Sequence, residues 1–399
     1  MTSRTRRFVA IAAGSLLAIL AALAAFVWWG PVPVSDKRVL LDFMLGRGIQ
    51  PPSAATVAER LQPPPGFRVQ VFSSEVPLAR VMVVTTAGDL IVSRTRANVV
   101  SLVERDGNSD GVSDGHRVLF QDLDGPHGLA LADGWLYIAE RTAIGRVRFD
   151  AATGRPTGPY EHILTGLTTD GFHQTKTIAF GPDGWLYLAQ GSSCNVCIEK
   201  DPRRATMMRM RADGTGAEIY ATGLRNSVGF DWAPWNGTLY ATDNGRDLLG
   251  DDFPPDELNR IEQGRFYGWP YFNGFGVPDP DLGGQYTGDA PPVHPAHGFR
   301  PHNAPLGIHF LRSARPSGYE RAALVALHGS WNRRTPDGYK VVALRWRDDG
   351  TIEESDFLTG FLNEDGIIGR PAFVTEGLDG AIYVSDDYAG VVYRLSAVP

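Results

Sequence analysis

The sequence predicts an all-β domain, a six-bladed β-propeller, behind an N-terminal transmembrane helix. Three observations lead to this prediction. An uncharged run near the N-terminus is long enough to cross a bilayer, a strand–turn–strand unit recurs about every 50 residues, and an early strand-like segment is available to close a ring with the last unit. The chain is thereby divided into a membrane anchor or signal segment (1–30), a proline-rich linker (31–65) and the propeller (66–399).

The anchor is predicted from the run between Phe8 and Trp29, which carries no charge. A helix of that length reaches ~33 Å, enough to cross the hydrocarbon core of a bilayer. Arg4, Arg6 and Arg7 precede the run, and the positive-inside rule places the rest of the chain outside the cytoplasm. We therefore expect an inner-membrane anchor with the domain facing the periplasm. Small residues in "LAALAAF" leave cleavage as a signal peptide open, and a buried core helix is the structural alternative.

The segment 31–65 contains many prolines and ends in "QPPPG", which is typical of a stiff tether between an anchor and a domain. Within it, the stretch from Val57 to Leu61 is expected to form a short amphipathic helix. Almost no other helix is expected outside the anchor.

The propeller is predicted from a repeat that consists of an apolar strand, a tight turn and a second strand ending in a polar residue. Most of the turns contain Asp-Gly or Asn-Gly, in which glycine accepts a positive φ. The turn glycines are Gly88, Gly134, Gly184, Gly237 and Gly380. The long gap before the last one holds a further unit, "YERAALVALHGSW", with its turn near Glu320, and an inserted loop at 264–300. The strand from Phe67 to Phe72 is expected to complete the last blade.

Composition excludes nucleic acid as the main partner. The chain has 38 Lys plus Arg against 45 Asp plus Glu, a net charge of −7, and no concentrated basic segment of the kind that binds phosphate backbones. A propeller by itself does not determine chemistry, because enzymes and binding modules share the fold. Candidate functional residues are therefore sought at strand ends and in loops on one face.

Two short segments carry candidate residues for catalysis. His173 lies in "FHQTK", directly before an expected inner strand, where it is either a base or an ordinary loop histidine. Arg225 and Asn226 in "ATGLRNSVGF" form a pair of donors suited to a carboxylate or a carbonyl oxygen. A surface salt-bridge arginine is the alternative for Arg225.

Two acidic loops carry candidate metal ligands. The loop from Asp243 to Glu257 offers several carboxylates with glycine and proline, a set of hard oxygen donors that suits Ca²⁺, or else it is a solvated acidic loop. The loop "DGNSDGVSD" places Asp106, Asn108 and Asp110 as in the start of a calcium loop. Position twelve of that pattern is an arginine, so a second calcium and a merely polar turn both remain open.

Cys194 and Cys197 are the only cysteines. Two cysteines cannot form a four-ligand zinc site, and a local disulfide is compatible with an extracytoplasmic domain. A redox Cys-x-x-Cys motif is less compatible, since it is expected at a helix start in a different fold.

An ordered set of motifs resembles a known family. The segments include "HQTKTIAFGPDGWLYLAQGSSCNVC", "DPRRATMMRM", "GLRNSVGFDW", "NGRDLLGDDFPPDEL", "FYGWPY", "HNAPLGIHF", "HGSWNR" and "GRPAFV". Together they resemble the sorbosone and pyranose dehydrogenase branch of the soluble-type PQQ-dependent sugar dehydrogenases. The resemblance extends from His116 to the C-terminus, and its strength lies in the order of the motifs rather than in any one of them.

The resemblance implies pyrroloquinoline quinone (PQQ) and Ca²⁺ as cofactors, held on one face of the propeller. It implies that His173 is the general base that takes the proton from the anomeric hydroxyl of a sugar, and that Arg225 and Asn226 contact the quinone oxygens. It further implies a calcium site at the backbone carbonyls of Gly245 and Arg246. The remaining implied cofactor contacts are Arg370, a cationic residue between His328 and Arg333, and His127 at the rim.

Two departures from the family pattern bear on substrate. Phe172 stands where glucose-oxidising relatives have an aspartate beside the base, and Arg246 stands where they have a proline. Both departures favour the sorbosone-like branch over glucose specificity.

The expected function is therefore oxidation of an aldose or related aldehyde by hydride transfer to PQQ, with electrons passed on to a cytochrome or a membrane quinone. Two other functions are compatible with a six-bladed propeller. One is a calcium-dependent lactonase, which needs acidic ligands from several blades around a channel metal. The other is a non-catalytic module that binds protein or glycan.

Overall fold

The computed structural model describes residues 34–313 and 318–398. The expected membrane helix lies outside these residues. Among the helices that the structure does describe, none has the length and apolar character needed to cross a bilayer.

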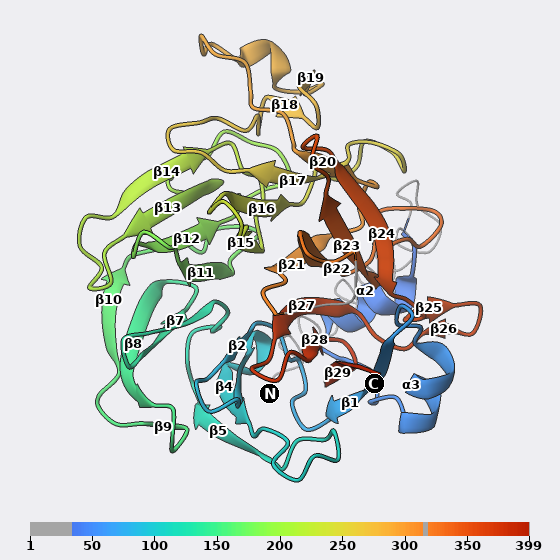
Figure 1. The fold of residues 1–399 in the computed structure, drawn as a ribbon. Helices are drawn as coiled ribbons and strands as arrows, with labels where there is room; N and C mark the ends of the chain where they lie inside the picture. Colours follow the sequence, from blue (N-terminus) through green and yellow to red (C-terminus); the bar gives the residue numbers. More distant parts are fainter. Residues whose placement is uncertain (1–33, 314–317, 399) are drawn as a thin grey trace, which may run out of the picture.

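The described chain forms six antiparallel blades around a common centre, as predicted (Figure 1). Within each blade the first strand is innermost and the chain proceeds outward. The first blade contains β2 (Met82–Val84), β3 (Leu90–Arg94), β4 (Val99–Val103) and β5 (His116–Phe120). The second contains β6 (Leu129–Ala132), β7 (Trp135–Ala139), β8 (Ala143–Asp150) and β10 (Glu161–Thr165), with β9 (Arg155–Pro156) beside β8. The third contains β11 (Lys176–Phe180), β12 (Leu186–Gln190), β13 (Thr206–Met210) and β14 (Glu218–Thr222).

The other three blades follow the same plan, and the sixth joins the two ends of the domain. The fourth blade contains β15 (Phe230–Trp232), β16 (Leu239–Asp243), β17 (Asp256–Arg260) and β20 (His297–Phe299). The fifth contains β21 (Pro305–Phe310), β22 (Ala322–Leu327), β23 (Lys340–Trp346) and β24 (Ile352–Leu358). The sixth contains β27 (Pro371–Glu376), β28 (Ile382–Asp386), β29 (Val391–Ala397) and β1 (Phe67–Ser73). The loops of the ring also contain two small hairpins, β18 (Phe272–Asn273) with β19 (Val277–Pro278) and β25 (Leu362–Asn363) with β26 (Gly366–Ile367). They contain two 3-10 turns as well, η1 (Thr95–Ala97) and η2 (Gly283–Gln285).

The ring closes where the sequence predicted. Strand β1 pairs antiparallel with β29, from Phe67 opposite Ala397 to Ser73 opposite Val392. The insertion expected at 264–300 contains the hairpin β18–β19 and then returns to supply β20, the outer strand of the fourth blade. Closure through a strand from the other end of the domain leaves the ring without an open seam.

The first strands of neighbouring blades approach closely at the centre. A Cβ atom on Gly229 would lie 2.1 Å from the carbonyl oxygen of Leu306, and one on Gly307 would lie 2.7 Å from the Cα of Phe373. Only glycine permits this contact between backbones, so these glycines allow the inner strands of neighbouring blades to pack directly against each other.

Antiparallel order sorts the loops onto two faces. The turns between first and second strands, and the loops between third and fourth strands, lie on one face. The loops that lead into each blade, and those between second and third strands, lie on the other, which we call the cavity face. Every predicted turn glycine belongs to the first face and has a positive φ, from 72° at Gly237 to 94° at Gly88.

Two helices precede the ring, more than the sequence predicted. Helix α3 (Ala54–Arg60) includes part of the expected helix, and α2 (Lys37–Met44) was not expected. Asp36 caps α2, since its Oδ1 accepts hydrogen bonds from the backbone N–H groups of Arg38 (2.8 Å) and Val39 (3.0 Å).

The segment predicted to be a tether packs against the propeller from residue 34 onward. Val57 and Leu61 are 1% and 3% exposed and belong to a core cluster with Phe361 of the fifth blade's outgoing loop. The backbone N–H of Ser35 donates to the carbonyl of Trp331 (2.9 Å), and that of Ile49 donates to Tyr388 (2.8 Å). Helix α2 therefore lies on the cavity face, between the loops of the fifth and sixth blades.

Candidate active site

The cavity face contains two adjoining cavities of about 290 and 370 Å³, a size that suits small-molecule ligands. Both are lined by Val39, Arg80, His173, Asn226, His328 and Arg370. The lining comes from α2 and from loops of different blades, so residues far apart in the sequence meet at one place. Arg225 lines the larger cavity together with His173 and Arg370. The base and the two arginines nominated from the sequence thus share one site.

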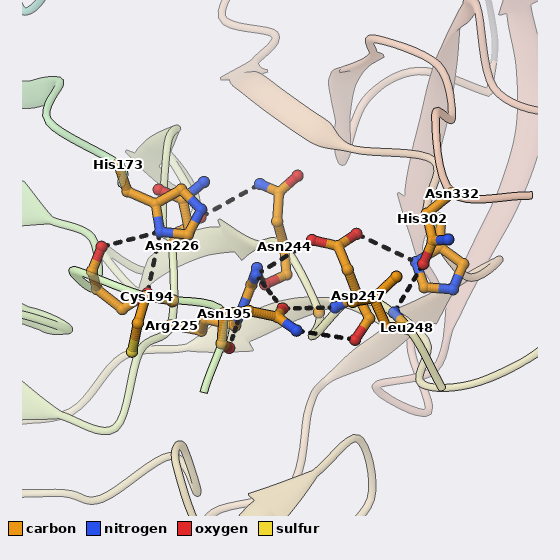
Figure 2. Close-up of polar contacts among 12 residues, drawn as sticks. His173, Cys194, Asn195, Arg225, Asn226, Asn244, Asp247, Leu248, His302 and Asn332 are labelled. Atoms are coloured by element: carbon orange, nitrogen blue, oxygen red, sulfur yellow. Dashed lines mark hydrogen bonds and ion pairs between the residues drawn. The ribbon is translucent and has the colours of Figure 1, made fainter. Parts of the chain in front are cut away.

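His173 lies in the loop that leads from β10 to β11. Its Nδ1 is 2.9 Å from Ser192 Oγ and 3.0 Å from the carbonyl of Ser192 (Figure 2). The hydroxyl of Ser192 donates its own hydrogen to the carbonyl of Cys194 (2.8 Å), so it accepts from the imidazole. Nδ1 therefore carries the proton, and Nε2 is left as the acceptor in a residue that lines the cavity.

The backbone of His173 has a φ of +46°, in the left-handed region that non-glycine residues seldom adopt. Such strain is maintained only where the surroundings hold it, and it occurs preferentially at functional sites. Arg204 stabilises this backbone conformation, because its Nη2 donates to the carbonyls of both Phe172 (2.5 Å) and Ser192 (2.7 Å).

The position of His173 also depends on Gly191, for which sequence reasoning gave no signal. A Cβ atom there would lie 2.7 Å from the Cβ of His173 and 2.5 Å from Oδ1 of Asn226. The absence of a side chain at Gly191 is what allows these two site residues to approach.

Desolvation first, and then the charge of Arg225, lower the pKa of His173 from 6.5 to about 3. The imidazole is therefore neutral at pH 7 and able to accept a proton. His328 behaves similarly, because desolvation and then the charge of Arg370 lower its pKa to about 4.

Arg225 is held by the loops of two blades. Its Nε donates to the carbonyl of Asn195 (3.0 Å), its Nη1 to the carbonyl of Asn244 (3.0 Å), and its Nη2 to Asn195 Oδ1 (2.9 Å) and Asp247 Oδ2 (3.3 Å) (Figure 2). Four of its five N–H groups are engaged in these bonds, which fix the plane of the guanidinium. The remaining N–H, on Nη1, is available to a ligand.

Arg370 is fixed in the same way on the opposite side of the cavity. Its Nε donates to the carbonyl of His328 (3.0 Å) and its Nη2 to that of Gly329 (2.9 Å). His328 Nε2 lies 2.7 Å from Asp387, which also forms an ion pair with Arg80. Burial disfavours the charge of Asp387, but interactions with His328, and then with Arg80, hold its pKa well below the usual range.

The cavity contains more arginines than the sequence indicated. Arg80 lines both cavities, and Arg96 and Arg47 line the smaller one. Their short loops carry no motif, and only the fold reveals that they converge.

Of the two residues nominated for calcium through their carbonyls, Gly245 lines the larger cavity and Arg246 lines neither cavity. Gly245 lines the larger cavity together with Asp247 and Asp256. Both carboxylates are engaged: Asp256 accepts the backbone N–H of Gly245 (2.8 Å) and of Ala304 (2.9 Å), and Asp247 Oδ2 accepts from Arg225 (3.3 Å). The side chain of Arg246 points elsewhere and forms ion pairs with Asp279 and Asp281.

A sequence model of the TrAA12-like family matches residues 61–271 and 288–397. The chain belongs to the TrAA12-like family.

Curated relatives and solved structures agree with the resemblance to PQQ-dependent sugar dehydrogenases. A pyrroloquinoline quinone-dependent pyranose dehydrogenase of Coprinopsis cinerea is 35% identical over 28% of this chain and 18% of its own length, and an uncharacterised protein of Borreliella burgdorferi is 37% identical over 53% and 56%. These matches span no more than about half the length of the relatives.

Among solved structures, the holo form of the PQQ domain of that pyranose dehydrogenase superposes with a TM-score of 0.71 at 22% identity, covering 84% of this chain and 97% of the domain. A calcium structure of the Trichoderma reesei AA12 enzyme gives a TM-score of 0.73 at 21% identity, covering 88% of this chain and 99% of that one. At these identities the superpositions establish the shared propeller.

Two residues nominated as cofactor contacts do not line the cavities of this TrAA12-like protein. His127 is fully buried, with Nδ1 3.2 Å from the carbonyl of Lys176, because its loop turns the ring toward the packed centre. Arg333 is 7% exposed and donates to the backbone carbonyls of Asp251 and Pro301, so it braces two loops behind the cavity wall.

The loop of Asp106, Asn108 and Asp110 lies on the opposite face of this TrAA12-like protein, where Asp106 and Gly88 line one hollow. Side-chain oxygens of all three accept backbone N–H groups of their own loop, at 2.8 to 3.1 Å. These bonds explain the spacing of the three polar residues by the formation of a polar turn. A second calcium in this loop stays a prediction.

Cys194 and Cys197 form a disulfide in the loop between β12 and β13. The same loop provides Ser192, which binds His173, and Asn195, which binds Arg225. The disulfide therefore belongs to the support of the site and excludes thiolate metal ligands at these positions.

Proposed function

We propose that this protein is a PQQ- and calcium-dependent dehydrogenase that oxidises an aldose or a related sugar at C1, within the sorbosone and pyranose dehydrogenase branch. One observation carries the proposal: a neutral imidazole, His173, shares a cavity with guanidinium groups that loops of separate blades hold in place. The names of the curated relatives, PQQ-dependent pyranose dehydrogenase and aldose sugar dehydrogenase, support it.

The residues present fit PQQ. The cofactor has three carboxylates, and Arg80, Arg96 and Arg370 line the cavity as fixed cations able to pair with them. The fifth N–H of Arg225 and the side chain of Asn226 are donors suited to quinone oxygens. For calcium, the carbonyl of Gly245 and the carboxylate of Asp247 are hard oxygen ligands in the same wall.

When bound, PQQ supplies a two-electron acceptor for the hydrogen on C1, and Ca²⁺ polarises it. His173 accepts the proton of the anomeric hydroxyl at Nε2, while Nδ1–H remains on Ser192 and keeps the ring oriented. Arg225 stabilises negative charge that develops on the acceptor oxygen, from a position fixed before the reaction. The sugar loses a hydride from C1 and a proton from O1 and leaves as the lactone.

A lactonase is disfavoured by the composition of the cavity wall. Such an enzyme needs acidic ligands from several blades around one metal. Among the described residues, the carboxylates that line the two cavities are Asp247, Asp256 and Asp387, and all three are engaged by backbone N–H groups or by cations. The arginines favour an anionic cofactor instead.

We also propose that residues 8–29 anchor the protein in the inner membrane with the propeller in the periplasm, and that electrons pass to a cytochrome or a membrane quinone. The uncharged run and the arginines before it support this arrangement. Substrate-dependent respiration in membranes should fall in a variant lacking residues 1–30, and an undiminished rate would count against the anchor's role.

The experiment for the catalytic proposal is dye reduction by the purified protein with added PQQ and Ca²⁺ across a panel of aldoses. His173→Ala should lower kcat by ~10²–10⁴-fold and leave PQQ binding, followed by absorbance titration, within about threefold of the wild type. His116→Ala, at a partly exposed histidine on the outer strand β5, is the matched control and should keep full activity. Turnover retained in His173→Ala, or absent in the wild type with every sugar, would overturn the proposal.

A further inference from the structure

Four exposed apolar side chains belong to segments on the cavity face: helix α2 with the turn after it, and one loop each of the fourth and fifth blades. Leu41 is 46% and Leu45 is 52% exposed on the outer side of the helix and the turn that follows it. Leu248 (53%) and Trp331 (37%) lie in adjacent loops, because the backbone N–H of Leu248 binds Asn332 at 2.7 Å (Figure 2). We call these four residues the Trp331 patch.

The Trp331 patch differs from scattered surface leucines in its position. Helix α2 begins where Ser35 binds the carbonyl of Trp331, and Val39 on its inner side lines both cavities. Leu41 and Leu45 are therefore exposed on a segment that borders the cavity, and Trp331 itself lines the larger cavity. Grouped apolar side chains with a tryptophan among them are typical of surfaces that meet a membrane interface.

The chain also emerges at the patch. The uncharged run ends at Trp29, and five residues separate it from Ser35, which is fixed to the loop of Trp331. The six extended Cα-to-Cα steps from Trp29 to Ser35 span at most about 20 Å. If the run crosses the bilayer, the cavity face must lie within that distance of the membrane surface, and the opposite face must point away.

We propose that the Trp331 patch rests on the outer surface of the lipid bilayer, so that the cavity face is turned toward the membrane. The inference depends on the proposed anchor and goes beyond it by naming the face and the residues that meet lipid. Arg38 and Arg334, whose side chains are both 81% exposed, border the patch and suit contact with lipid phosphates.

Contact through this patch is one-sided. The loops of the second and third blades, which carry His173 and Cys194, lie across the cavity from Trp331. They remain open to water and can admit a sugar, while an acceptor dissolved in the membrane approaches from the side of the patch.

The test uses the full chain in lipid nanodiscs with one nitroxide label at a time. The two native cysteines form a disulfide, so Leu41→Cys and Leu248→Cys each supply one reactive thiol. Val112→Cys and Leu378→Cys are controls, with side chains 46% and 67% exposed on the opposite face. The measurement is collision of the label with oxygen, which concentrates in lipid, relative to a water-soluble nickel chelate.

Labels at positions 41 and 248 should show an oxygen-to-nickel ratio at least threefold higher than the two controls. The difference should vanish in variants that also lack residues 1–30. Equal ratios at all four positions, a higher ratio at the controls, or failure of the full chain to join nanodiscs would each overturn the inference. Sugar-dependent dye reduction by the same labelled proteins reports separately on the catalytic proposal, so failure of one does not imply failure of the other.

Discussion

At the scale of single residues, the side chains of the site are positioned by hydrogen bonds from neighbouring residues. Arg225 was recognisable in the sequence because it stands in a motif, but its geometry depends on Asn195, which lies thirty positions earlier. The side chain of Asn195 also accepts the backbone N–H of Asp247 (2.9 Å) and donates to its carbonyl (3.0 Å). Asn195 thus ties the third blade to the loop of Asp247 in the fourth blade.

Replacing Asn195 with alanine should release Arg225 without removing any group that touches substrate. We expect Asn195→Ala to lower kcat by ~10–100-fold, with a smaller change in KM, because misplacement of a preorganised donor acts on the transition state. Steady-state kinetics with saturating PQQ measure this effect. Asn236→Ala, in an exposed turn on the opposite face, should leave kcat unchanged; equal kinetics for both variants would contradict the positioning role.

The ionisation of His173 gives a second prediction at this scale. Its pKa, lowered to about 3 by desolvation and then by Arg225, implies that the cofactor-free protein shows no titration of this ring between pH 5 and 8. The unfolded chain binds a proton near pH 6.5, so the stability contributed by the neutral ring is present above that pH and is lost as pH falls toward 3.

Nuclear magnetic resonance of the imidazole, assigned with His173→Gln, tests this ionisation. Arg225→Met removes the positive charge of Arg225, which helps to lower the pKa of His173, and should therefore raise that pKa. A midpoint near 6.5 in the wild type would contradict the description of the site.

At the scale of elements, the turns were predictable and the loops of the cavity face were not. A glycine in a short turn leaves a local signal, as at Gly184, because only a few backbone conformations join two antiparallel strands. The loop between β12 and β13 leaves no local signal of its shape. That shape depends on the disulfide and on Arg204, which connect separate parts of the loop, and on Asp247 in another blade.

The disulfide between Cys194 and Cys197 should matter more for activity than for stability. In the chain-entropy view, such a short loop contributes about 2 kcal/mol or less to the free energy of unfolding. Its loss would loosen both Ser192 and Asn195. We expect a double variant, Cys194→Ser with Cys197→Ser, to lose at least tenfold in kcat/KM with only a small fall in Tm.

Treatment with a reductant supplies the control for the disulfide. Wild-type protein should approach the double variant in kcat/KM, and the double variant should not respond. Full activity of the reduced wild type would show that the loop holds its shape unaided.

Helix α3 was expected as an isolated amphipathic turn, and its packing could not be read from the sequence. Val57 is 1% exposed within the cluster around Phe361. Val57→Ala should therefore lower the free energy of unfolding by about 2 kcal/mol, measured by guanidinium denaturation. Val112→Ala, at a valine 46% exposed, is the control; equal stabilities would mean that the segment before the ring is only a tether.

At the scale of the whole molecule, the sequence predicted the number of blades, the strand that closes the ring and the meeting of His173, Arg225, Asn226 and Arg370. Those features depend on repeats and motifs, which are local. Arg80 and Val39 could not be found in this way, because they stand in short segments without a motif. Arg80 reaches the cavity through the fold of the ring, and Val39 through the packing of helix α2 on the cavity face. His127 has the right position along the repeat but is buried toward the interior, and Arg333, nominated from the resemblance, braces two loops behind the cavity wall.

The central claim is that cations from separate blades form one site for an anionic quinone. Calorimetric titration of the protein with PQQ in the presence of Ca²⁺ tests it most directly. We expect saturable binding at one site, weakened at least tenfold by Arg370→Met and by Arg80→Met, and changed less than threefold by Arg333→Met, which replaces an arginine behind the wall. Absence of saturable binding, or equal affinities in all three variants and the wild type, would contradict the account.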